Sequence, residues 1–108
     1  MKIRAIGASG GTAPGYRTTC FLIDDRFLID CGAAASAMSP EDQANITDIF
    51  ITHPHLDHIQ DIAFLVENSF SSTRKQLHLR SMKSILEDVH EHLFNNIIWP
   101  DFSNIVSN

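Results

Sequence analysis

The sequence predicts a mixed α/β (α+β) fold in a single domain. Apolar, strand-like runs alternate with stretches whose apolar residues recur at helical spacing. The strand-like runs cover 2–6, 18–23, 26–30 and 46–51, and the helical patterns cover about 59–70 and 81–95. A chain of 108 residues has room for one modest hydrophobic core. Together these observations indicate one mixed domain.

The composition is that of a soluble globular chain, with 44% hydrophobic and 19% charged residues. The net charge of −5 argues against broad binding to nucleic acid or to an anionic membrane, because either would need a basic face. A small phosphate substrate remains compatible with this net charge, since bound metal ions would make the charge at the binding site positive. No nucleic-acid partner and no membrane partner are therefore expected.

The sequence gives no sign of a targeting or membrane-spanning segment. A glycine-rich stretch stands where a signal peptide would carry its apolar region, and no apolar run approaches the roughly 20 residues that span a bilayer. The two cysteines, Cys20 and Cys31, have no metal-binding spacing. We expect both to be small buried residues that stay reduced, which favours a cytoplasmic location.

A glycine-rich loop is expected after the first strand. Residues 7–15 contain four glycines and a proline, a composition typical of turns. The spacing matches neither the dinucleotide-binding nor the P-loop motif, and no good helix follows. This loop is therefore expected to border the active site rather than to cradle a nucleotide.

A β-hairpin is predicted for residues 18–30, with a tight turn at Asp24 and Asp25. Its second strand ends at Asp30, next to Cys31 and Gly32. An aspartate at this position acts either as a loop cap or as the carboxylate that receives the free N–H of a metal-bound histidine. Both roles for Asp30 are kept open here, with the second preferred.

Helices and strands are expected to alternate through the rest of the chain. Residues 33–38 predict one helical turn, and Ser39 before Pro40 is typical of an N-cap followed by a helix start. The later elements are a strand at 46–51, a helix of about ten residues after His58, a polar loop at 71–75, a short strand at 76–79 and a helix over about 81–95. The apolar tail at 97–102 is expected to be buried.

The chemical centre of the sequence is the segment His53-Pro54-His55-Leu56-Asp57-His58. Imidazole and carboxylate groups are the usual ligands of zinc and related divalent metals. His53 and His55 alternate along an extended backbone, so their side chains point to the same side. Asp57 and His58 follow where the chain turns into a helix, so they can face a second ion. A polar loop with chance histidines is the weaker interpretation, and His78, His90 and His92 are expected to be structural or exposed.

This segment resembles the H-x-H-x-D-H motif of hydrolases with the metallo-β-lactamase fold. The strand ending in Asp30-Cys31-Gly32 is similar to the Asp-x-Gly strand of that superfamily. Within it, the chain most resembles the class II 3′,5′-cyclic-nucleotide phosphodiesterases. Four segments carry the resemblance: 7–11, 17–22, 53–59 and 96–102. A departure from the family pattern is Ile59-Gln60-Asp61, where a small residue or a glycine pair usually follows the motif.

The resemblance implies a four-layer αββα sandwich, of which residues 1–108 would be the N-terminal half, with the C-terminal half absent. It implies that His53 and His55 bind one ion and that Asp57 and His58 bind a second. Asp57 would also orient the nucleophile. Asp30 would accept a hydrogen bond from a metal-bound histidine without binding the ion itself. The implied cofactors are two Zn²⁺ ions, with Mn²⁺ or Fe as alternatives, and no organic cofactor. The remaining ligands would come from the other half.

The implied function is hydrolysis of a cyclic nucleotide, cAMP or cGMP, to a 5′-nucleotide by a hydroxide that two metal ions activate. One alternative is another hydrolase of the same fold, acting on tRNA 3′ ends or on thioesters. The other alternative is an inactive chain that binds metal weakly or associates with a partner. Because half a sandwich would expose one face of its sheet, a homodimer is possible.

Overall fold

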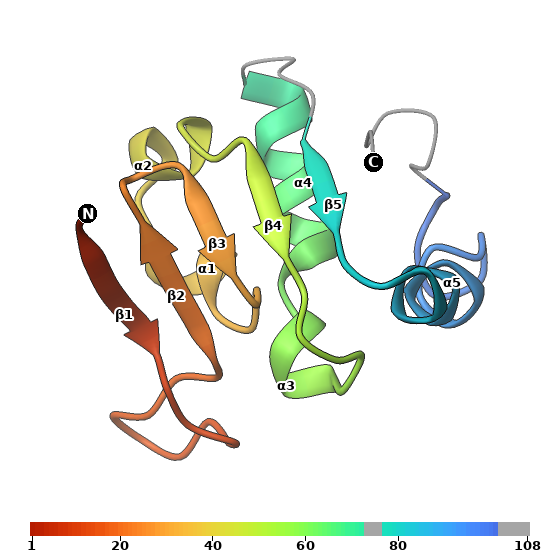
Figure 1. The fold of residues 1–108 in the computed structure, drawn as a ribbon, viewed down its shortest axis with the longest axis horizontal. Coiled ribbons are helices and arrows are strands. Elements are labelled where there is room, and N and C mark those ends of the chain that lie inside the picture. Colours follow the sequence, from red (N-terminus) through yellow and green to blue (C-terminus); the bar gives the residue numbers. More distant parts are fainter. Residues whose placement is uncertain (73–76, 102–108) are drawn as a thin grey trace.

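A computed structural model describes residues 1–72 and 77–101 as a five-stranded sheet with helices packed behind it (Figure 1). The strands are β1 (Ile3–Gly7), β2 (Cys20–Ile23), β3 (Phe27–Ile29), β4 (Asp48–Phe50) and β5 (His78–Arg80). The helices are α1 (Ala34–Ala37), α2 (Pro40–Ala44), α3 (Leu56–Ile59), α4 (Ile62–Ser72) and α5 (Lys83–His92). The predicted mixed α/β class is confirmed. No helix in the described part of the chain is long and apolar enough to cross a membrane.

The order of strands across the sheet is the order of strands along the chain, β1-β2-β3-β4-β5. The first two pairings are antiparallel, and the pairings β3–β4 and β4–β5 are parallel. As a result, β1, β3, β4 and β5 all end at the same edge of the sheet, the lower edge in Figure 1. Loops that follow parallel strands at such an edge are where α/β proteins place their ligand sites.

Local sequence explains the elements that lead to this edge. The hairpin between β2 and β3 turns at Asp24 and Asp25, whose φ angles of 51° and 60° are those of a type I′ turn. Ser39 caps α2, because its hydroxyl accepts a hydrogen bond from the backbone N–H of Asp42 at 3.1 Å, and Pro40 begins the helix. The predicted hairpin and the predicted helix start are therefore confirmed.

The two faces of the sheet differ in cover. One face packs its alternate side chains, among them Leu22, Leu28 and Ile49, against the helices, and these side chains are at most 2% exposed. Helices α1, α2 and α4 all lie on this side (Figure 1). The opposite face, here called the open face, carries half-buried or exposed apolar residues and no helix among the described residues. Among these residues are Phe21, Ile23, Phe27, Ile29 and Phe50.

The helix expected directly after His58 is instead two helices, α3 and α4, with a break at Gln60 and Asp61. In a continuous helix the N–H of Asp61 would bond to the carbonyl of Asp57. It bonds instead to the carbonyl of Cys31 at 2.9 Å, and the carbonyl of His58 accepts from the N–H of Cys31 at 2.7 Å. The backbone at the end of β3 therefore interrupts the helix.

The structure corrects three further expectations. Ser71 and Ser72 belong to α4 rather than to a loop, and the rest of the predicted loop, 73–75, lies outside the described residues. Met82, expected within the helix at 81–95, instead stands at the N-cap position before α5 and is 70% exposed. The tail was predicted to be buried, but Ile97 is 84% and Ile98 is 61% exposed. Phe102 lies outside the described residues.

Candidate metal centre

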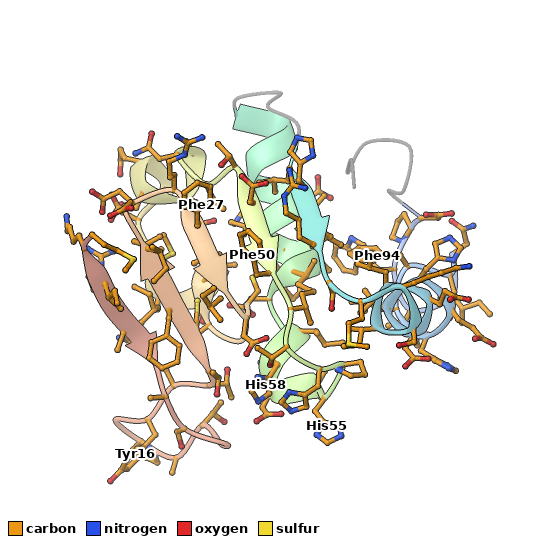
Figure 2. All side chains as sticks on the ribbon, in the orientation of Figure 1. Tyr16, Phe27, Phe50, His55, His58 and Phe94 are labelled. Atoms are coloured by element: carbon orange, nitrogen blue, oxygen red, sulfur yellow. The ribbon has the colours of Figure 1, made fainter. Side chains whose placement is uncertain are left out.

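The three histidines of the motif lie together in the loop between β4 and α4. The ring centres of His53 and His55 are 4.6 Å apart, and those of His53 and His58 are 3.9 Å apart. Asp57 joins them through its Oδ2, which lies 3.3 Å from Nε2 of His58. His55 and His58 both stand at the lower edge of the molecule, beside α3 (Figure 2). The cluster thus occupies the carboxyl end of the parallel strands.

Asp30 holds this loop in place from the end of β3. Its Oδ1 accepts the backbone N–H of Thr52, and its Oδ2 accepts the Thr52 hydroxyl, both at 2.8 Å. The same Oδ2 lies 2.7 Å from Nδ1 of His58. Asp30 is 3% exposed and has a φ of 61°, so its backbone is bent to direct the carboxylate at the loop. This geometry is the one in which a carboxylate orients a ligating histidine.

These contacts determine which ring nitrogens face outward. Because the Thr52 hydroxyl gives its single proton to Asp30, we assign Nδ1–H of His53 as the donor to Thr52 Oγ1 at 3.0 Å. In the same way, Nδ1–H of His58 donates to Asp30. In this tautomer the lone pair of each ring is on Nε2, the nitrogen that would bind a metal.

Gly32 allows the end of β3 to approach α3. A Cβ atom at this position would lie 2.2 Å from the carbonyl oxygen of Asp57 and 2.6 Å from Oγ1 of Thr18. The neighbouring Cys31 forms the backbone hydrogen bonds to His58 and Asp61 described above. The sequence Asp30-Cys31-Gly32 therefore positions both the side chains and the backbone of the motif.

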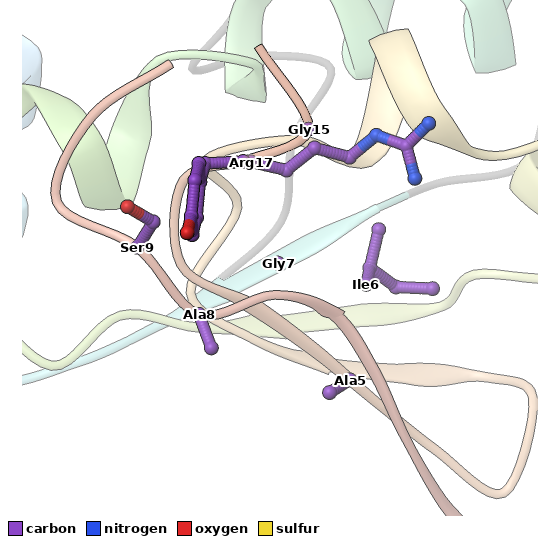
Figure 3. Close-up of a pocket in the computed structure, with 8 residues that line it drawn as sticks. Ala5, Ile6, Gly7, Ala8, Ser9, Gly15 and Arg17 are labelled. Carbon is purple, nitrogen blue, oxygen red and sulfur yellow. The ribbon is translucent and has the colours of Figure 1, made fainter. Parts of the chain in front are cut away.

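The glycine-rich loop borders the cluster, as expected. A Cβ at Gly10 would lie 3.9 Å from Oδ2 of Asp57, and a cavity of about 410 Å³ lies between this loop and Asp57. A second cavity, of about 350 Å³, lies between the loop and the end of β1 (Figure 3). In that view Arg17 extends away from Ser9 and toward Ile6.

The residues fit a divalent ion by donor type and spacing, but not by number. Zinc ligands at about 2.0–2.1 Å in a tetrahedral arrangement lie roughly 3.3–3.4 Å from each other. The 3.3 Å between His58 Nε2 and Asp57 Oδ2 matches this value. Among the described residues, however, no group of three or more His, Cys, Asp or Glu side chains is arranged around one point. Among the described residues, these side chains therefore do not by themselves complete the coordination of one ion.

Sequence reasoning missed two residues of this region. Thr52 links Asp30 to His53, and its position directly before the motif was the available signal. Asp61 is 5% exposed and accepts hydrogen bonds from the N–H and hydroxyl of Ser36, at 3.0 and 3.1 Å. No sequence pattern indicated that Asp61 would anchor α1. His78 lies on β5 and is half-buried, and His90 and His92 lie on α5 and are exposed, as expected.

Comparison with known proteins decides the family. A sequence model of the family described as class-II cAMP phosphodiesterases matches residues 33–108. The chain belongs to this family. The 3′,5′-cyclic-nucleotide phosphodiesterase 1 of Saccharomyces cerevisiae is 40% identical over 62 residues, covering 54% of this chain and 16% of the yeast protein. Ribonuclease Z of Lactococcus lactis subsp. cremoris is 36% identical over 93 residues, covering 73% of this chain and 29% of that enzyme.

Solved structures show the fold. The unliganded yeast PDE1 structure superposes with a TM-score of 0.77 at 21% identity, covering 92% of this chain and 46% of the yeast chain. The metallo-β-lactamase fold protein YhfI of Bacillus subtilis superposes with a TM-score of 0.66 at 24% identity, covering 82% of this chain and 39% of YhfI. The predicted metallo-β-lactamase-like fold is therefore confirmed. The chain spans less than half the length of each of these proteins.

Proposed function

We propose that this chain carries the metal-binding half of a hydrolase that converts 3′,5′-cyclic nucleotides to 5′-nucleotides. The observation that carries the proposal is the cluster of His53, His55, Asp57 and His58 in a chain of the class-II cAMP phosphodiesterase family. Hydrolases of this fold and family generally use divalent metal ions. The three imidazoles and one carboxylate favour Zn²⁺, with Mn²⁺ or Fe as alternatives.

Each residue of the cluster has a proposed role. His53 and His55 would hold one ion, and Asp57 and His58 would hold the second. When bound, the ions would neutralise charge on the phosphoryl oxygens and lower the pKa of water. Asp57 would also orient the attacking water through its carboxylate, and Asp30 would keep Nε2 of His58 directed at the ion by holding Nδ1. The contact of 2.7 Å between Asp30 and His58 supports the last role.

We also propose that residues 1–108 form the N-terminal half of an αββα domain. The open face supports this, because its apolar side chains have no helix over them in the described part of the chain. The yeast structure supports it as well, since the chain covers 46% of its length. The other half, or a second copy in a homodimer, would supply the further ligands. An isolated monomer is therefore expected to be inactive.

The two free cysteines support a cytoplasmic location.

The second candidate is an RNA-processing hydrolase of the same fold. The observation that favours it is the match to ribonuclease Z, which extends over 93 residues. The net charge of −5 counts against it, because a long nucleic-acid substrate needs a basic surface. The family match over residues 33–108 favours the cyclic-nucleotide substrate.

To test this, the chain is fused to the C-terminal part of the yeast phosphodiesterase that lies beyond the matched region. Hydrolysis of cAMP, cGMP, bis-p-nitrophenyl phosphate, a precursor tRNA and a thioester is measured for the fusion and for the chain alone. We expect the fusion to hydrolyse cyclic nucleotides and the monomeric chain to hydrolyse none. His55→Ala should abolish the activity, and His90→Ala, on α5 at the surface, should retain it. Faster cleavage of the tRNA or of the thioester would contradict the proposal.

A further inference from the structure

An apolar groove lies directly beside the histidine cluster. It has a volume of about 620 Å³, and its walls come from α3, from α5 and from the loop after α5. Small-molecule sites in proteins commonly have volumes of about 300–1,000 Å³ and mostly apolar linings with a few polar groups. Pro54 and Leu56, which flank His55 in the sequence, form part of the wall. The groove therefore adjoins the histidine-containing loop through these two residues.

The groove has an apolar floor and apolar rims. Ile59 and Val89 lie at its floor and are 8% and 2% exposed. Leu56 and Ile98 stand at the rims and are 69% and 61% exposed. Leaving two large aliphatic side chains in water costs about 25 cal/mol for each Å² of apolar surface. A flat apolar ring that entered between Leu56 and Ile98 would recover part of this cost.

The loop that carries Ile98 is held in shape before any ligand arrives. Oδ1 of Asn95 accepts the backbone N–H groups of Ile97 and Ile98, both at 2.9 Å. The N–H of Asn96 donates to the carbonyl of Trp99 at 2.9 Å, and the Trp99 ring packs edge-on against Phe64 at 5.1 Å. A rim fixed in this way loses little conformational entropy on binding, which favours a small ligand.

The polar groups of the groove are an acceptor and an imidazole. Asp88 lies in the wall, and its side chain forms no hydrogen bond or ion pair with any other described residue. His92 lies one turn further along α5 and has a weak contact of 3.9 Å with Glu91. A carboxylate without a partner accepts hydrogen bonds from N–H donors and repels anions. The groove thus suits a flat ring that carries N–H groups, and does not suit a phosphate.

We propose that this groove binds the purine base of the substrate, while the phosphate lies at the histidine cluster. The base would lie between Leu56 and Ile98 over Val89, with an N–H group donating to Asp88. The proposal rests on the proposed cyclic-nucleotide function, since it assigns the second end of the same substrate. The position of His55 between Pro54 and Leu56, two residues of the groove wall, supports it.

The test uses nucleosides, which have a base but no phosphate. Adenosine and guanosine are titrated into the metal-free 108-residue chain with labelled methyl groups, and the methyl NMR signals are followed. We expect shifts at Leu56, Val89 and Ile98, and none with ribose alone. Ile98→Ser should weaken nucleoside binding by at least fivefold. Ile97→Ser is the matched control, because Ile97 is the adjacent, more exposed isoleucine and does not line the groove.

The outcomes separate this proposal from the proposed function. Absence of shifts at the three methyl-bearing residues, equal shifts with ribose, or equal effects of Ile98→Ser and Ile97→Ser would overturn the base site. Nucleoside binding requires neither a metal ion nor catalysis. Binding by the chain alone therefore supports the base site even if the fusion fails to hydrolyse cyclic nucleotides. Conversely, hydrolysis by the fusion with an unchanged KM in Ile98→Ser would overturn the base site alone.

Discussion

Oδ2 of Asp30 lies 2.7 Å from Nδ1 of His58, across 28 residues of sequence. The same carboxylate binds the backbone and the hydroxyl of Thr52. One buried side chain at the end of β3 therefore fixes both ends of the histidine-containing loop. Folding stability and the geometry of the proposed metal site depend on the same three contacts.

Asp30→Asn is expected to reduce both stability and metal affinity. The amide keeps the size of the side chain and tolerates the left-handed backbone, but it cannot accept all three hydrogen bonds as a carboxylate does. We expect a loss of about 1.5–3 kcal/mol in the free energy of unfolding. We also expect roughly 10- to 100-fold weaker zinc binding. Urea denaturation and titration calorimetry with Zn²⁺ measure the two effects.

Asp25→Asn is the control for Asp30→Asn. Asp25 has nearly the same φ, 60°, but its side chain is 55% exposed in the hairpin turn. It should change stability by less than about 0.5 kcal/mol and leave zinc binding unchanged. If the two variants behaved alike, the contacts of Asp30 would not be what holds the loop.

Gly32→Ala is expected to destabilise the fold by about 1–3 kcal/mol or more. The new Cβ would lie 2.2 Å from the carbonyl oxygen of Asp57, which is backbone and cannot rotate away. Thermal unfolding followed by circular dichroism measures the loss. Gly11→Ala offers a matched control, since nothing lies within 4 Å of a Cβ at that position. An unchanged melting temperature for Gly32→Ala would show that the approach of β3 to α3 is looser than described.

The ion pair between Asp48 and Arg80 should contribute stability that is lost in acid. Burial acts to raise the pKa of the Asp48 carboxyl, but hydrogen bonds from Thr47 and Arg80 and the charge of Arg80 outweigh it and lower this pKa. The carboxylate is thus favoured in the folded state. Its contribution is complete above the unfolded pKa of about 3.9 and falls as the pH drops through the folded pKa.

Asp48→Asn measures this contribution. At pH 7 we expect it to lower the free energy of unfolding by about 1–2 kcal/mol. The difference from the natural chain should shrink as the pH falls through the lowered pKa of Asp48, because its side chain then loses the charge that the amide lacks. Asp42→Asn is the comparison, since its pair with Arg4 at 3.3 Å is nearly half exposed on both sides. A difference for Asp48→Asn that stays constant with pH would contradict this account.

The two thiols should be unreactive in the folded chain. Burial raises the pKa of Cys20 to about 12 and raises that of Cys31 well above its ordinary value. Attack on a disulfide reagent needs the thiolate, so reaction with Ellman's reagent at pH 8 should proceed only through unfolding. The absorbance change is expected to be slow in buffer and complete within the mixing time in 8 M urea. Rapid modification in buffer would mean that the core opens locally.

Local sequence patterns predicted the parts of the fold that depend on neighbouring residues. The turn at Asp24 and Asp25 and the cap at Ser39 were found this way, because each conformation follows from a few adjacent side chains. The clustering of His53 and His55 followed from their alternation along an extended segment. The roles of the site residues in metal binding and catalysis stay predictions.

Features that depend on distant contacts could not be predicted. The break between α3 and α4 arises because Cys31 forms backbone hydrogen bonds to His58 and Asp61. A pattern of apolar residues does not indicate that the backbone of a distant residue will take the hydrogen bonds of a helix. The exposure of Ile97 and Ile98 was likewise not predicted. Their backbone N–H groups donate hydrogen bonds to Oδ1 of Asn95, and these bonds fix the loop in a conformation that leaves both side chains exposed. Hydrophobicity alone indicated burial there.

The strand order of the sheet has a consequence for synthesis on the ribosome. Since every strand lies beside its neighbours in sequence, each newly emerged strand can add to the edge of the sheet already formed. Such local pairing keeps the cost of loop closure low and favours rapid folding. Asp30 follows β3 and is made before β4, so the carboxylate that binds Thr52 and His58 is available as soon as the histidine loop emerges.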